Sequence, residues 1–337
     1  MGRILVTGGA GYIGTHTIVE LLALGYEVVA VDNYLNSSPK SYERIEKISG
    51  KLIEYHNIDL SNDEQTADFF KDLSADAVIH FAALKSVPES VDMPNSYYKN
   101  NLNSLLNVME GMKKNGLNNL IFSSSCSVYG NPEQLPVTEE TPFGEAESPY
   151  ARSKQMGEYI ISDFCKSNSN FKALSLRYFN PAGAHHSIEI GEAQSKRPNN
   201  LVPIITQTAA GIRDKMTVFG TNYNTRDGSC IRDYIHVSDI AEAHVKGVDF
   251  LLKYSNQENY HVINLGSGIG TTVLEMLHSF EKVSNRKLNY EIGKKRQGDV
   301  SAIFANNEKA KQLLNWESKR TLDEILKSAW EWQEKLL

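Results

Sequence analysis

Residues 6–16 read VTGGAGYIGTH, and this glycine-rich stretch decides the fold that we expect. An apolar run leads into it and a helix-like segment leads out. In that setting glycines let backbone N–H groups approach a pyrophosphate at the positive end of a helix. Two glycine patterns fit: G-x-G-x-x-G uses Gly9, Gly11 and Gly14, and T-G-x-x-G-x-x-G uses Thr7, Gly8, Gly11 and Gly14. Either pattern predicts a dinucleotide-binding turn.

Asp32 strengthens this prediction. It ends the second apolar run, about twenty residues after the turn, where a dinucleotide-binding unit places a carboxylate. That carboxylate accepts hydrogen bonds from a ribose 2′-OH and repels a 2′-phosphate, and Asn33 to Leu35 supply no arginine that would bind the phosphate. We therefore expect NAD rather than NADP as the cofactor.

The first half of the chain alternates short apolar runs with helix-like segments, a pattern typical of βαβ units. The runs are apolar throughout, as expected for strands buried on both faces. We predict strands at Ile4–Val6, Glu27–Val31, Leu52–Ile58, Ala77–Phe81, Leu120–Ser123 and Ala173–Arg177, and helices at Tyr12–Leu24, Glu64–Lys71, Pro94–Lys114 and Tyr150–Lys166. These elements predict an α/β fold with a Rossmann-type, doubly wound parallel sheet.

After Asn180 the texture of the sequence changes. Residues 181–233 are rich in glycine, proline and polar side chains. In the remaining chain we predict helices at Val202–Ala210, Val237–Leu252 and Thr321–Leu336, and a strand at His261–Leu265. We expect an NAD-binding domain over residues 1–180, to which segments near 234–265 return, and a smaller mixed α/β substrate domain over residues 181–337.

The composition narrows the classes of function. The chain has 337 residues, of which 41% are hydrophobic and 23% charged, an ordinary globular balance that allows two compact lobes. A net charge of −6 argues against a nucleic-acid partner. The cysteines Cys126, Cys165 and Cys230 are scattered, which favours a reducing compartment over a disulfide framework or a zinc site. No apolar run approaches membrane-spanning length, and the first one enters the glycine turn directly, so we expect a cytoplasmic protein without a signal peptide.

A tyrosine and a lysine one helical turn apart are the candidate catalytic groups. The segment SPYARSK places Tyr150 and Lys154 on one face of a helix. A free phenol, with a pKa of about 10, is a poor base at neutral pH, but a nearby ammonium and an oxidised nicotinamide would both stabilise the phenolate. Tyr150 could then take a proton from a sugar hydroxyl while a hydride leaves for NAD. Upstream, IFSSSCSVYG ends a strand in three serines, and Ser125 is the candidate for a hydroxyl that hydrogen-bonds the reacting oxygen.

Together, the glycine turn, the serine and Y-x-x-x-K are similar to the pattern of the extended short-chain dehydrogenase/reductase superfamily, which uses the register of Gly8, Gly11 and Gly14. Longer stretches resemble the UDP-glucose 4-epimerase family in particular. They are GGAGYIGTHT, VDNYLNSS, HFAALKSVPESV, FSSSCSVYG, SPYARSK, LRYFNPAGAH, PNNLVP, DGSCIRDYIHVSD, NLGSG and RQGDVSA. The resemblance runs from residue 6 to beyond residue 300 and so covers almost the whole chain.

The resemblance implies two sets of ligand contacts and no metal. The residues that it assigns to NAD are Gly8, Gly11, Tyr12, Ile13, Gly14, Asp32, Asn33, Asp59, Leu60, Phe81, Ala82, Ala83, Lys85, Asn100, Tyr150, Lys154 and Phe179. Those assigned to a UDP-sugar are Ser125, Asn180, Asn200, Leu201, Thr217, Phe219, Arg232, Arg296, Asp299 and Ile303. The chemistry agrees for the two arginines, because guanidinium forks match phosphate oxygens, and Asp299 can accept both hydroxyls of the uridine ribose.

The resemblance also implies a mechanism for interconverting UDP-galactose and UDP-glucose. The 4′-OH loses its proton to Tyr150, whose pKa Lys154 lowers and which Ser125 assists, while the C4′ hydride passes to NAD. The 4-keto sugar then rotates in the pocket, and the hydride returns to its opposite face. Because there is no net redox change, we expect NAD to be tightly bound.

Ile303 is the informative departure from the family. The family often carries a tyrosine there that narrows the hexose pocket, and members that accept N-acetylated sugars carry something smaller. Isoleucine lies between the two, so we expect a side activity on UDP-GalNAc and UDP-GlcNAc. The adjacent His185 and His186 have no further ligand at suitable spacing, so they predict no metal site.

The helix expected at Pro94–Lys114 bears on the oligomeric state. It carries Leu102, Leu105, Leu106, Met109 and Met112 at helical spacing, which predicts core packing. In the family two such helices per subunit pair across a two-fold axis, and the resemblance therefore implies a homodimer.

Four other functions fit parts of the pattern. A 4,6-dehydratase needs an Asp–Glu pair beside Ser125, where this chain has Cys126 and Ser127. A UDP-glucuronate epimerase needs an extra cation near the sugar C6, which the sequence neither places nor excludes. A non-catalytic NAD-binding regulator would usually lack the tyrosine or the lysine. A simple dehydrogenase would not need the UDP-binding stretches.

Overall fold

The computed structural model describes residues 2–192, 198–253, 258–296 and 299–337. Its centre is a seven-stranded sheet in the order β10-β6-β5-β4-β1-β2-β3, with every neighbouring pair parallel. The strands are β1 (Arg3–Thr7), β2 (Glu27–Asp32), β3 (Glu54–Asn57), β4 (Ala77–His80), β5 (Asn119–Ser125), β6 (Lys172–Tyr178) and β10 (Tyr260–Leu265). The predicted fold class is therefore confirmed.

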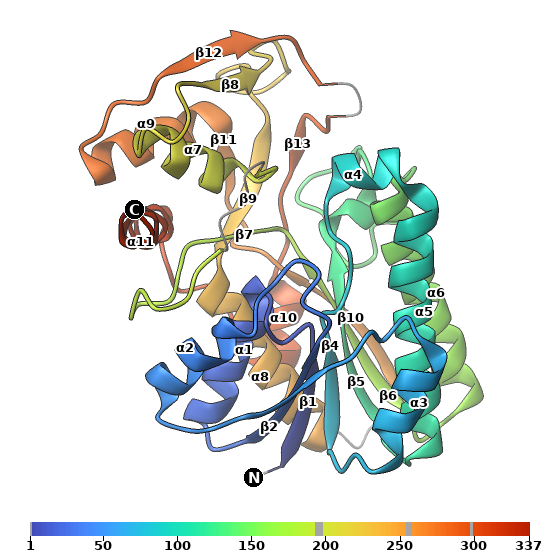
Figure 1. Cartoon of the computed structure of the whole chain (residues 1–337). Coiled ribbons are helices and arrows are strands. Elements are labelled where there is room, and N and C mark those ends of the chain that lie inside the picture. The colour runs from blue at the N-terminus through green and yellow to red at the C-terminus, as the bar shows by residue number, and fades with distance from the viewer. Residues whose placement is uncertain (1, 193–197, 254–257, 297–298) are drawn as a thin grey trace.

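Helices cover both faces of this sheet (Figure 1). One face carries α1 (Tyr12–Ala23), α2 (Lys40–Ser49), α8 (Val237–Lys253) and α10 (Glu308–Leu314). The other face carries α3 (Asp63–Lys71), α5 (Pro94–Lys114) and α6 (Pro149–Ser167), with the short α4 (Val87–Asp92) against α5 and α6. Each face has its own apolar core. Successive residues of a strand point to opposite faces, so Ile4 and Leu5 are buried in different cores.

The order of the strands reverses at β1, the strand that precedes the glycine turn. From β1 the chain first builds outward through β2 and β3, and then returns to the other side of β1 to add β4, β5 and β6. Ligands of doubly wound sheets bind at the carboxyl ends of the strands where this reversal occurs. The turn after β1 and the end of β4 lie at that point.

A smaller unit lies over the carboxyl ends of the strands (Figure 1). It contains the sheet β11-β9-β13, with β7 paired to β9, and the separate pair β12-β8. Its strands are β7 (Asn180–Ala182), β8 (Met216–Phe219), β9 (Ile231–His236), β11 (Gly270–Thr272), β12 (Tyr290–Gly293) and β13 (Ala302–Ile303). Its helices are α7 (Leu201–Ala209), α9 (Val273–Ser284) and α11 (Leu322–Lys335), which share one apolar core. The boundary expected at residue 180 stays a prediction.

The structure differs from the sequence prediction mainly in short elements. The strand expected at Leu52–Ile58 is only β3 (Glu54–Asn57), because it is an edge strand and three of its four residues are exposed. The helices α2, α4, α9 and α10 and the strands of the smaller unit were not predicted. Each of those strands has six residues or fewer.

Candidate active site

The glycine turn joins β1 to α1 through a backbone too crowded for side chains. Gly8 has a φ of +68°, which favours glycine, and a Cβ there would lie 2.8 Å from a backbone nitrogen of the loop after β4. A Cβ on Gly14 would collide with the carbonyl oxygen of Gly8. Gly8 and Gly14, which are constrained in this way, both belong to the T-G-x-x-G-x-x-G pattern. Gly9 is also close-packed, since a Cβ there would lie 2.9 Å from the Cβ of Ala30, so it allows the turn to pack on β2.

The turn leaves the N-terminus of α1 open and sets Asp32 beside it. The N-cap of α1 is Gly11, which offers no side-chain cap, so the first N–H groups of the helix are suited to an anion. The Asp32 carboxylate accepts hydrogen bonds from the N–H of Ala10 (3.1 Å), the N–H of Tyr34 (2.9 Å) and Oγ of Ser37 (2.8 Å). A cradle without side chains, an open helix end and a fixed carboxylate fit NAD.

The remaining residues assigned to NAD nearly all follow the carboxyl ends of sheet strands. Tyr12 and Ile13 are in the first turn of α1, Asn33 follows β2, Asp59 and Leu60 follow β3, Phe81, Ala82, Ala83 and Lys85 follow β4, Phe179 follows β6, and Asn100 lies on α5. The N–H of Ala82 donates to Oγ1 of Thr7 at 3.3 Å, which fixes the loop after β4 against the glycine turn. Most of these positions therefore lie at the same edge of the sheet.

The helix that carries the catalytic candidates begins at a defined point. Ser148 is the N-cap of α6, and its Oγ accepts a hydrogen bond from the N–H of Ala151 at 3.2 Å. Pro149 occupies the first helical position, where a missing N–H costs nothing. This start fixes where Tyr150 and Lys154 lie on the first two turns of α6.

The three catalytic candidates lie together at the junction of β5 and α6. Ser125 is the last residue of β5, and its side chain lies near the Tyr150 hydroxyl, where it acts to lower the pKa of the phenol. Nζ of Lys154 donates to the carbonyl oxygen of Ser123 at 2.6 Å and lies 5.9 Å from the centre of the Tyr150 ring. A hydroxyl, a phenol and an ammonium therefore converge at the end of a buried strand.

Burial controls the protonation of this group. It raises the pKa of Tyr150 to about 12, although the hydrogen bond with Ser125 acts in the opposite direction. It lowers the pKa of Lys154 to about 8, against the opposing influence of the Glu158 charge. The chain alone thus raises the tyrosine pKa, whereas the sequence predicts a lowered one for the complete site. The largest cause of the difference is burial of the phenol, and the second predicted charge belongs to the nicotinamide.

The residues assigned to the UDP group meet in the smaller unit. Nη2 of Arg232 on β9 pairs with Oδ1 of Asp299 at 2.6 Å. The Arg296 guanidinium stacks 3.8 Å from the centre of the Phe219 ring at the end of β8. The N–H of Asp299 donates to the carbonyl oxygen of Arg296 at 3.4 Å, which joins the two pairs. Asp299 therefore contacts Arg232 through its side chain and Arg296 through its backbone.

Asn180 on β7 and Ile303 on β13 both lie on strands that pair with β9. Asn180 follows Phe179 into β7, and its Oδ1 is buried without a hydrogen-bond partner among the described residues. Ile303 pairs with Arg232 in the β13–β9 register and is buried in one apolar cluster with Phe179, against which Cys126 packs. The apolar cluster therefore adjoins Cys126, the residue after β5, and Asn180 keeps an unpaired acceptor.

The other assigned residues are less directly placed. Asn200 is the N-cap of α7 and Leu201 its first residue, and Nδ2 of Asn200 donates to Oε1 of Glu192 at 2.7 Å. Thr217 lies on β8, where its Oγ1 donates to Glu291 at 3.4 Å. The structure brings Asn200 toward Lys85, because the same Glu192 oxygen is 3.6 Å from Nζ of Lys85.

Sequence reasoning missed two acidic residues at this site. Glu192 joins Asn200 to Lys85, and no motif marked it. Glu158 forms a buried ion pair with Arg177 directly behind Lys154. Its position four residues after Lys154 was the available signal, because residues at that spacing share a helix face.

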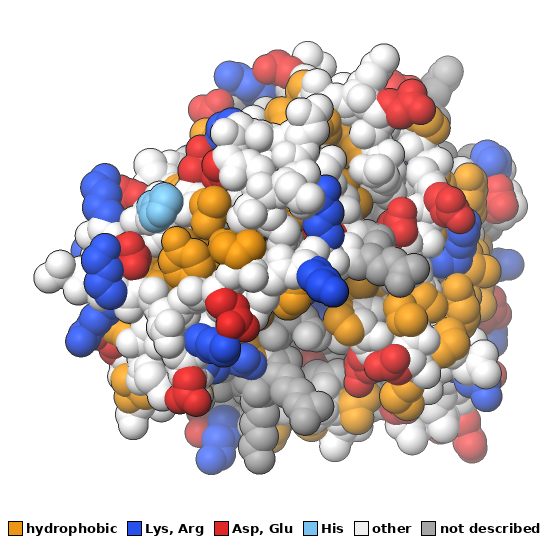
Figure 2. Space-filling model, turned by 90° about the horizontal axis from the view of Figure 1, so that it is seen from above, with side chains coloured by type: hydrophobic (Ala, Val, Ile, Leu, Met, Phe, Trp, Pro, Cys, Tyr) orange, Lys and Arg blue, Asp and Glu red, His pale blue; other side chains and the backbone are white. Residues whose placement is uncertain are grey.

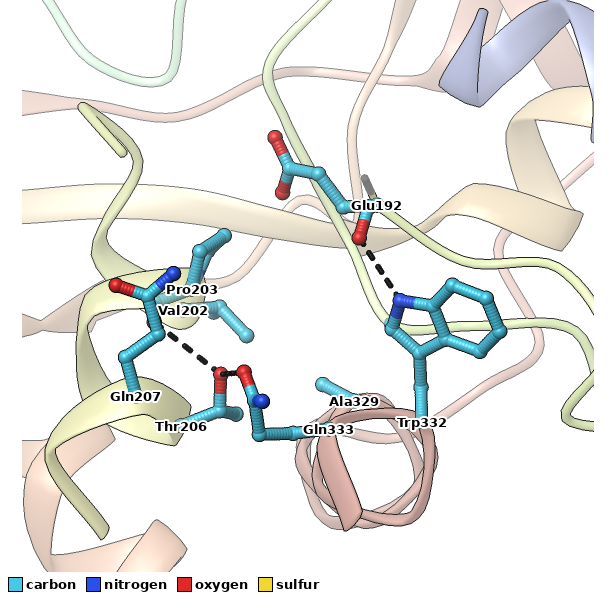
Figure 3. A pocket seen from close by; sticks show the side chains of 9 residues that line it. Glu192, Val202, Pro203, Thr206, Gln207, Ala329, Trp332 and Gln333 are labelled. Atoms are coloured by element: carbon cyan, nitrogen blue, oxygen red, sulfur yellow. Dashed lines mark hydrogen bonds between the residues drawn. The ribbon is translucent and has the colours of Figure 1, made fainter. Parts of the chain in front are cut away.

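A separate small pocket lies between α7 and α11 (Figure 3). Glu192, Thr206, Trp332 and Gln333 are among the residues that line it, and Nε1 of Trp332 donates to the carbonyl oxygen of Glu192 at 2.8 Å. Ser125, Tyr150 and Lys154 do not line it, so it is not the pocket of the catalytic candidates.

Three further observations concern the surface charge, membrane-spanning helices and possible metal ligands. Figure 2 shows Lys and Arg side chains interspersed with Asp and Glu across the face seen from above. Within residues 2–192, 198–253, 258–296 and 299–337, no helix combines the length and apolarity that crossing a bilayer requires. In the same part of the chain, no three or more His, Cys, Asp or Glu side chains form a group that could hold a metal ion.

Comparison with known proteins gives a consistent family. The NAD dependent epimerase/dehydratase family matches residues 4–266. The chain is 43% identical to a Drosophila melanogaster UDP-glucose 4-epimerase, over 98% of this chain and 96% of that protein. It is 46% identical to a Bacillus subtilis UDP-glucose 4-epimerase, over 98% and 96%.

Solved structures agree with these relatives. A UDP-glucose 4-epimerase from Stenotrophomonas maltophila with bound NAD and formylated UDP-arabinopyranose has a TM-score of 0.96 and 39% identity, and the match covers 100% of this chain and 99% of that one. The Bifidobacterium longum enzyme in complex with NAD+ and UDP has a TM-score of 0.94 and 43% identity, covering 99% and 98%. The chain therefore belongs to the NAD dependent epimerase/dehydratase family and is an NAD-dependent isomerase, similar over nearly its whole length to UDP-glucose 4-epimerases.

Proposed function

We propose that this enzyme interconverts UDP-galactose and UDP-glucose by oxidation at C4 of the hexose, rotation of the 4-keto sugar and re-reduction. The observation that carries the proposal is the convergence of Ser125, Tyr150 and Lys154 beside a dinucleotide turn. NAD, when bound, would accept the C4 hydride and return it, and it should be held tightly because the cycle leaves it unchanged. Full-length similarity to enzymes of this name supports the choice of substrate.

Tyr150 is the proposed base. Burial disfavours its phenolate, and the Ser125 hydroxyl favours that form by donating to it. Lys154 contributes a positive charge 5.9 Å from the ring, anchored by its hydrogen bond to Ser123. The same tyrosine returns its proton to the sugar oxygen when the hydride returns.

The UDP group is proposed to bind between Arg232, Arg296 and Asp299. The Arg296 guanidinium lies 3.8 Å from the centre of the Phe219 ring, and the guanidinium fork suits bidentate phosphate recognition. Arg232 is held by Oδ1 of Asp299, and Oδ2, which accepts a hydrogen bond from Sγ of Cys230 at 3.5 Å, has a further lone pair for a ribose hydroxyl. The unpaired Oδ1 of Asn180 is an acceptor for a hexose hydroxyl.

We further propose a side activity on UDP-GalNAc and UDP-GlcNAc. Ile303 is buried in one cluster with Phe179 near the end of β5, and its branched aliphatic side chain is smaller than that of tyrosine. The additional space would admit an N-acetyl group. No turnover of UDP-GalNAc at high enzyme concentration, in a preparation active on UDP-galactose, would contradict this part of the proposal.

The oligomeric state and location are also proposed. A homodimer is supported by exposed apolar side chains on two packed helices: Leu106 on α5, and Met156 and Tyr159 on α6. A cytoplasmic location is supported by the three cysteines, all of which are free. Fractionation of the source cells would test the location.

The decisive experiment is proton NMR of the anomeric region after purified protein is mixed with UDP-galactose and no added cofactor. Growth of UDP-glucose signals to an equilibrium mixture would support both epimerisation and retained NAD. Conversion only after NAD is added would support the reaction but contradict tight retention. A spectrum that stays unchanged even with NAD would overturn the proposal.

A further inference from the structure

A buried charge network lies behind Lys154 and has no part in the mechanism above. Glu158 on α6 and Arg177 on β6 form an ion pair at 2.7 Å, and their side chains are only 3% and 5% exposed. Nε of Arg177 donates to the other carboxylate oxygen at 2.9 Å, so the pairing is bidentate. Because desolvation offsets most of the stability gained by a buried ion pair, its presence at the catalytic junction points to a further role.

Glu158 links this network to the reacting end of β5. It lies one helical turn after Lys154 on the same face of α6. Its carboxylate accepts a hydrogen bond from Oγ of Ser124, while Lys154 donates to the carbonyl oxygen of Ser123 at 2.6 Å. Successive turns of α6 therefore bind successive residues of β5, immediately before Ser125.

The charges around Lys154 single out Glu158. The titratable groups that face this pair from the surrounding elements are His80 on β4, Cys126 and Tyr129 on the 3-10 helix after β5, Tyr150 on α6, Arg177 and Tyr178 on β6, and Tyr260 on β10. Burial lowers the pKa of His80 to about 3 and raises those of the tyrosines and of Cys126, so these groups are uncharged at neutral pH. The negative charge near Lys154 therefore comes from Glu158.

We propose that Glu158 is a positioning residue: its carboxylate keeps the Lys154 ammonium charged and, through Ser124, holds the end of β5 against α6. The inference rests on the proposed roles of Tyr150 and Lys154. Arg177 fixes the carboxylate and also donates to the Tyr129 hydroxyl at 2.8 Å, which in turn donates to Asn264 at 2.6 Å. The network thus extends from α6 to β10.

The consequence concerns the alkaline side of the activity. Burial lowers the pKa of Lys154 to about 8, and Glu158 opposes that lowering. Without the carboxylate, the ammonium would lose its proton at a lower pH and would no longer stabilise a phenolate at Tyr150. The pH at which activity declines should follow the charge at position 158.

The test measures the Lys154 titration directly. The holoenzyme is labelled with lysine carrying 13C at Cε, and the Lys154 resonance is the one that Lys154→Met removes. Glu158→Gln should move its titration midpoint down by about one pH unit or more, with the alkaline limb of kcat moving alongside. Ser124→Ala is the matched control, because it removes the hydrogen bond to β5 and keeps the charge. It should lower kcat and leave the midpoint in place.

Arg177→Gln tests the same inference in the opposite direction. It leaves the Glu158 charge unopposed, so the midpoint should rise. An unchanged midpoint in either folded variant would overturn the inference. If the wild type does not convert UDP-galactose, the proposed function fails, while the NMR titration still decides whether Glu158 sets the charge of Lys154.

Discussion

At the scale of single residues, the phenol of Tyr150 is the group on which the proposed chemistry depends most. Tyr150→Phe removes one oxygen from a buried site and leaves the ring, so the fold and UDP-sugar binding should be retained. Losing a general base typically costs a factor of about 10² to 10⁴ in rate, and we expect kcat for UDP-galactose to fall by that amount. The anomeric NMR assay measures it directly.

The control for this change lies on the same helix. Tyr159 is 61% exposed on α6, so Tyr159→Phe makes an identical chemical change away from the junction and should retain near-normal kcat. Equal losses in the two variants, or full activity in Tyr150→Phe, would show that the phenol is not the base.

Gly14 gives a second prediction at this scale. A Cβ there would collide with the carbonyl oxygen of Gly8, so Gly14→Ala must shift the turn that cradles the cofactor. We expect the variant to lose bound NAD, measured as nucleotide released on denaturing the purified protein. Gly50→Ala is the control: it has a φ of +68° but no atom within 4 Å of its Cβ, so it should cost stability and leave the NAD content unchanged. Full NAD content in Gly14→Ala would contradict the assignment of the turn.

Residues that form short sequence motifs could be predicted, and residues brought together by the fold could not. Ser125, Tyr150 and Lys154 were found because each ends a strand or shares one helix face. Arg177 was not found, because it reaches Glu158 only when β6 is placed beside β5. Glu192 was missed for the same reason, because it contacts Lys85, which is far from it in sequence.

At the scale of elements, long buried segments could be predicted and short ones could not. α5 has the same bounds as predicted, because its apolar spacing is regular over 21 residues. β9 (Ile231–His236) contains charged residues and becomes a strand only by pairing with β7, β11 and β13. α9 had a usable signal: Thr272 and Glu275 form a capping box at its start.

The prediction at the scale of elements concerns the packed helices α5 and α6. Leu106 on α5 is 47% exposed, and if these helices meet a second copy it is buried there. Leu106→Glu would then place a charge in an apolar interface, and we expect a monomer by light scattering at concentrations where the wild type is a dimer. Leu52→Glu is the control, because Leu52 is 88% exposed beside the edge strand β3. A wild-type monomer, or a dimer that persists in Leu106→Glu, would contradict the proposed interface.

At the scale of the whole molecule, buried histidines connect the fold to acid stability. Burial lowers the pKa values of His16, His80 and His236 to about 3 and that of His244 to about 4. They lie in both units and on different elements, so no local rearrangement would expose all of them. Each stays neutral in the folded chain at a pH where the unfolded chain binds a proton.

The sign of the effect follows from this difference. Because the folded pKa is below the unfolded value near 6.5, the unfolded state binds more protons, and stability is lost as pH falls below about 6.5 toward the folded pKa. Each such histidine removes about 1.4 kcal/mol of unfolding free energy per pH unit in that range. Four of them acting together approach the whole stability of a typical domain within about two pH units. We therefore expect steep acid unfolding above pH 4, measured as the urea midpoint at pH 7, 6 and 5 with NAD held constant.

A single substitution tests the cause. His244 is fully buried on α8, where Nδ1 bonds the carbonyl oxygen of Ile240 and Nε2 bonds the Tyr178 hydroxyl at 2.6 Å. His244→Gln cannot take up the proton, so although it is less stable at pH 7, its unfolding free energy should fall less steeply with pH, by about 1.4 kcal/mol per unit. His278→Gln changes an exposed histidine on α9 and is the matched control. If the unfolding free energy falls with pH equally steeply in His244→Gln and in the wild type, the acid sensitivity belongs to other groups. The reason is that a histidine with the same pKa in the folded and unfolded states cannot couple folding to pH.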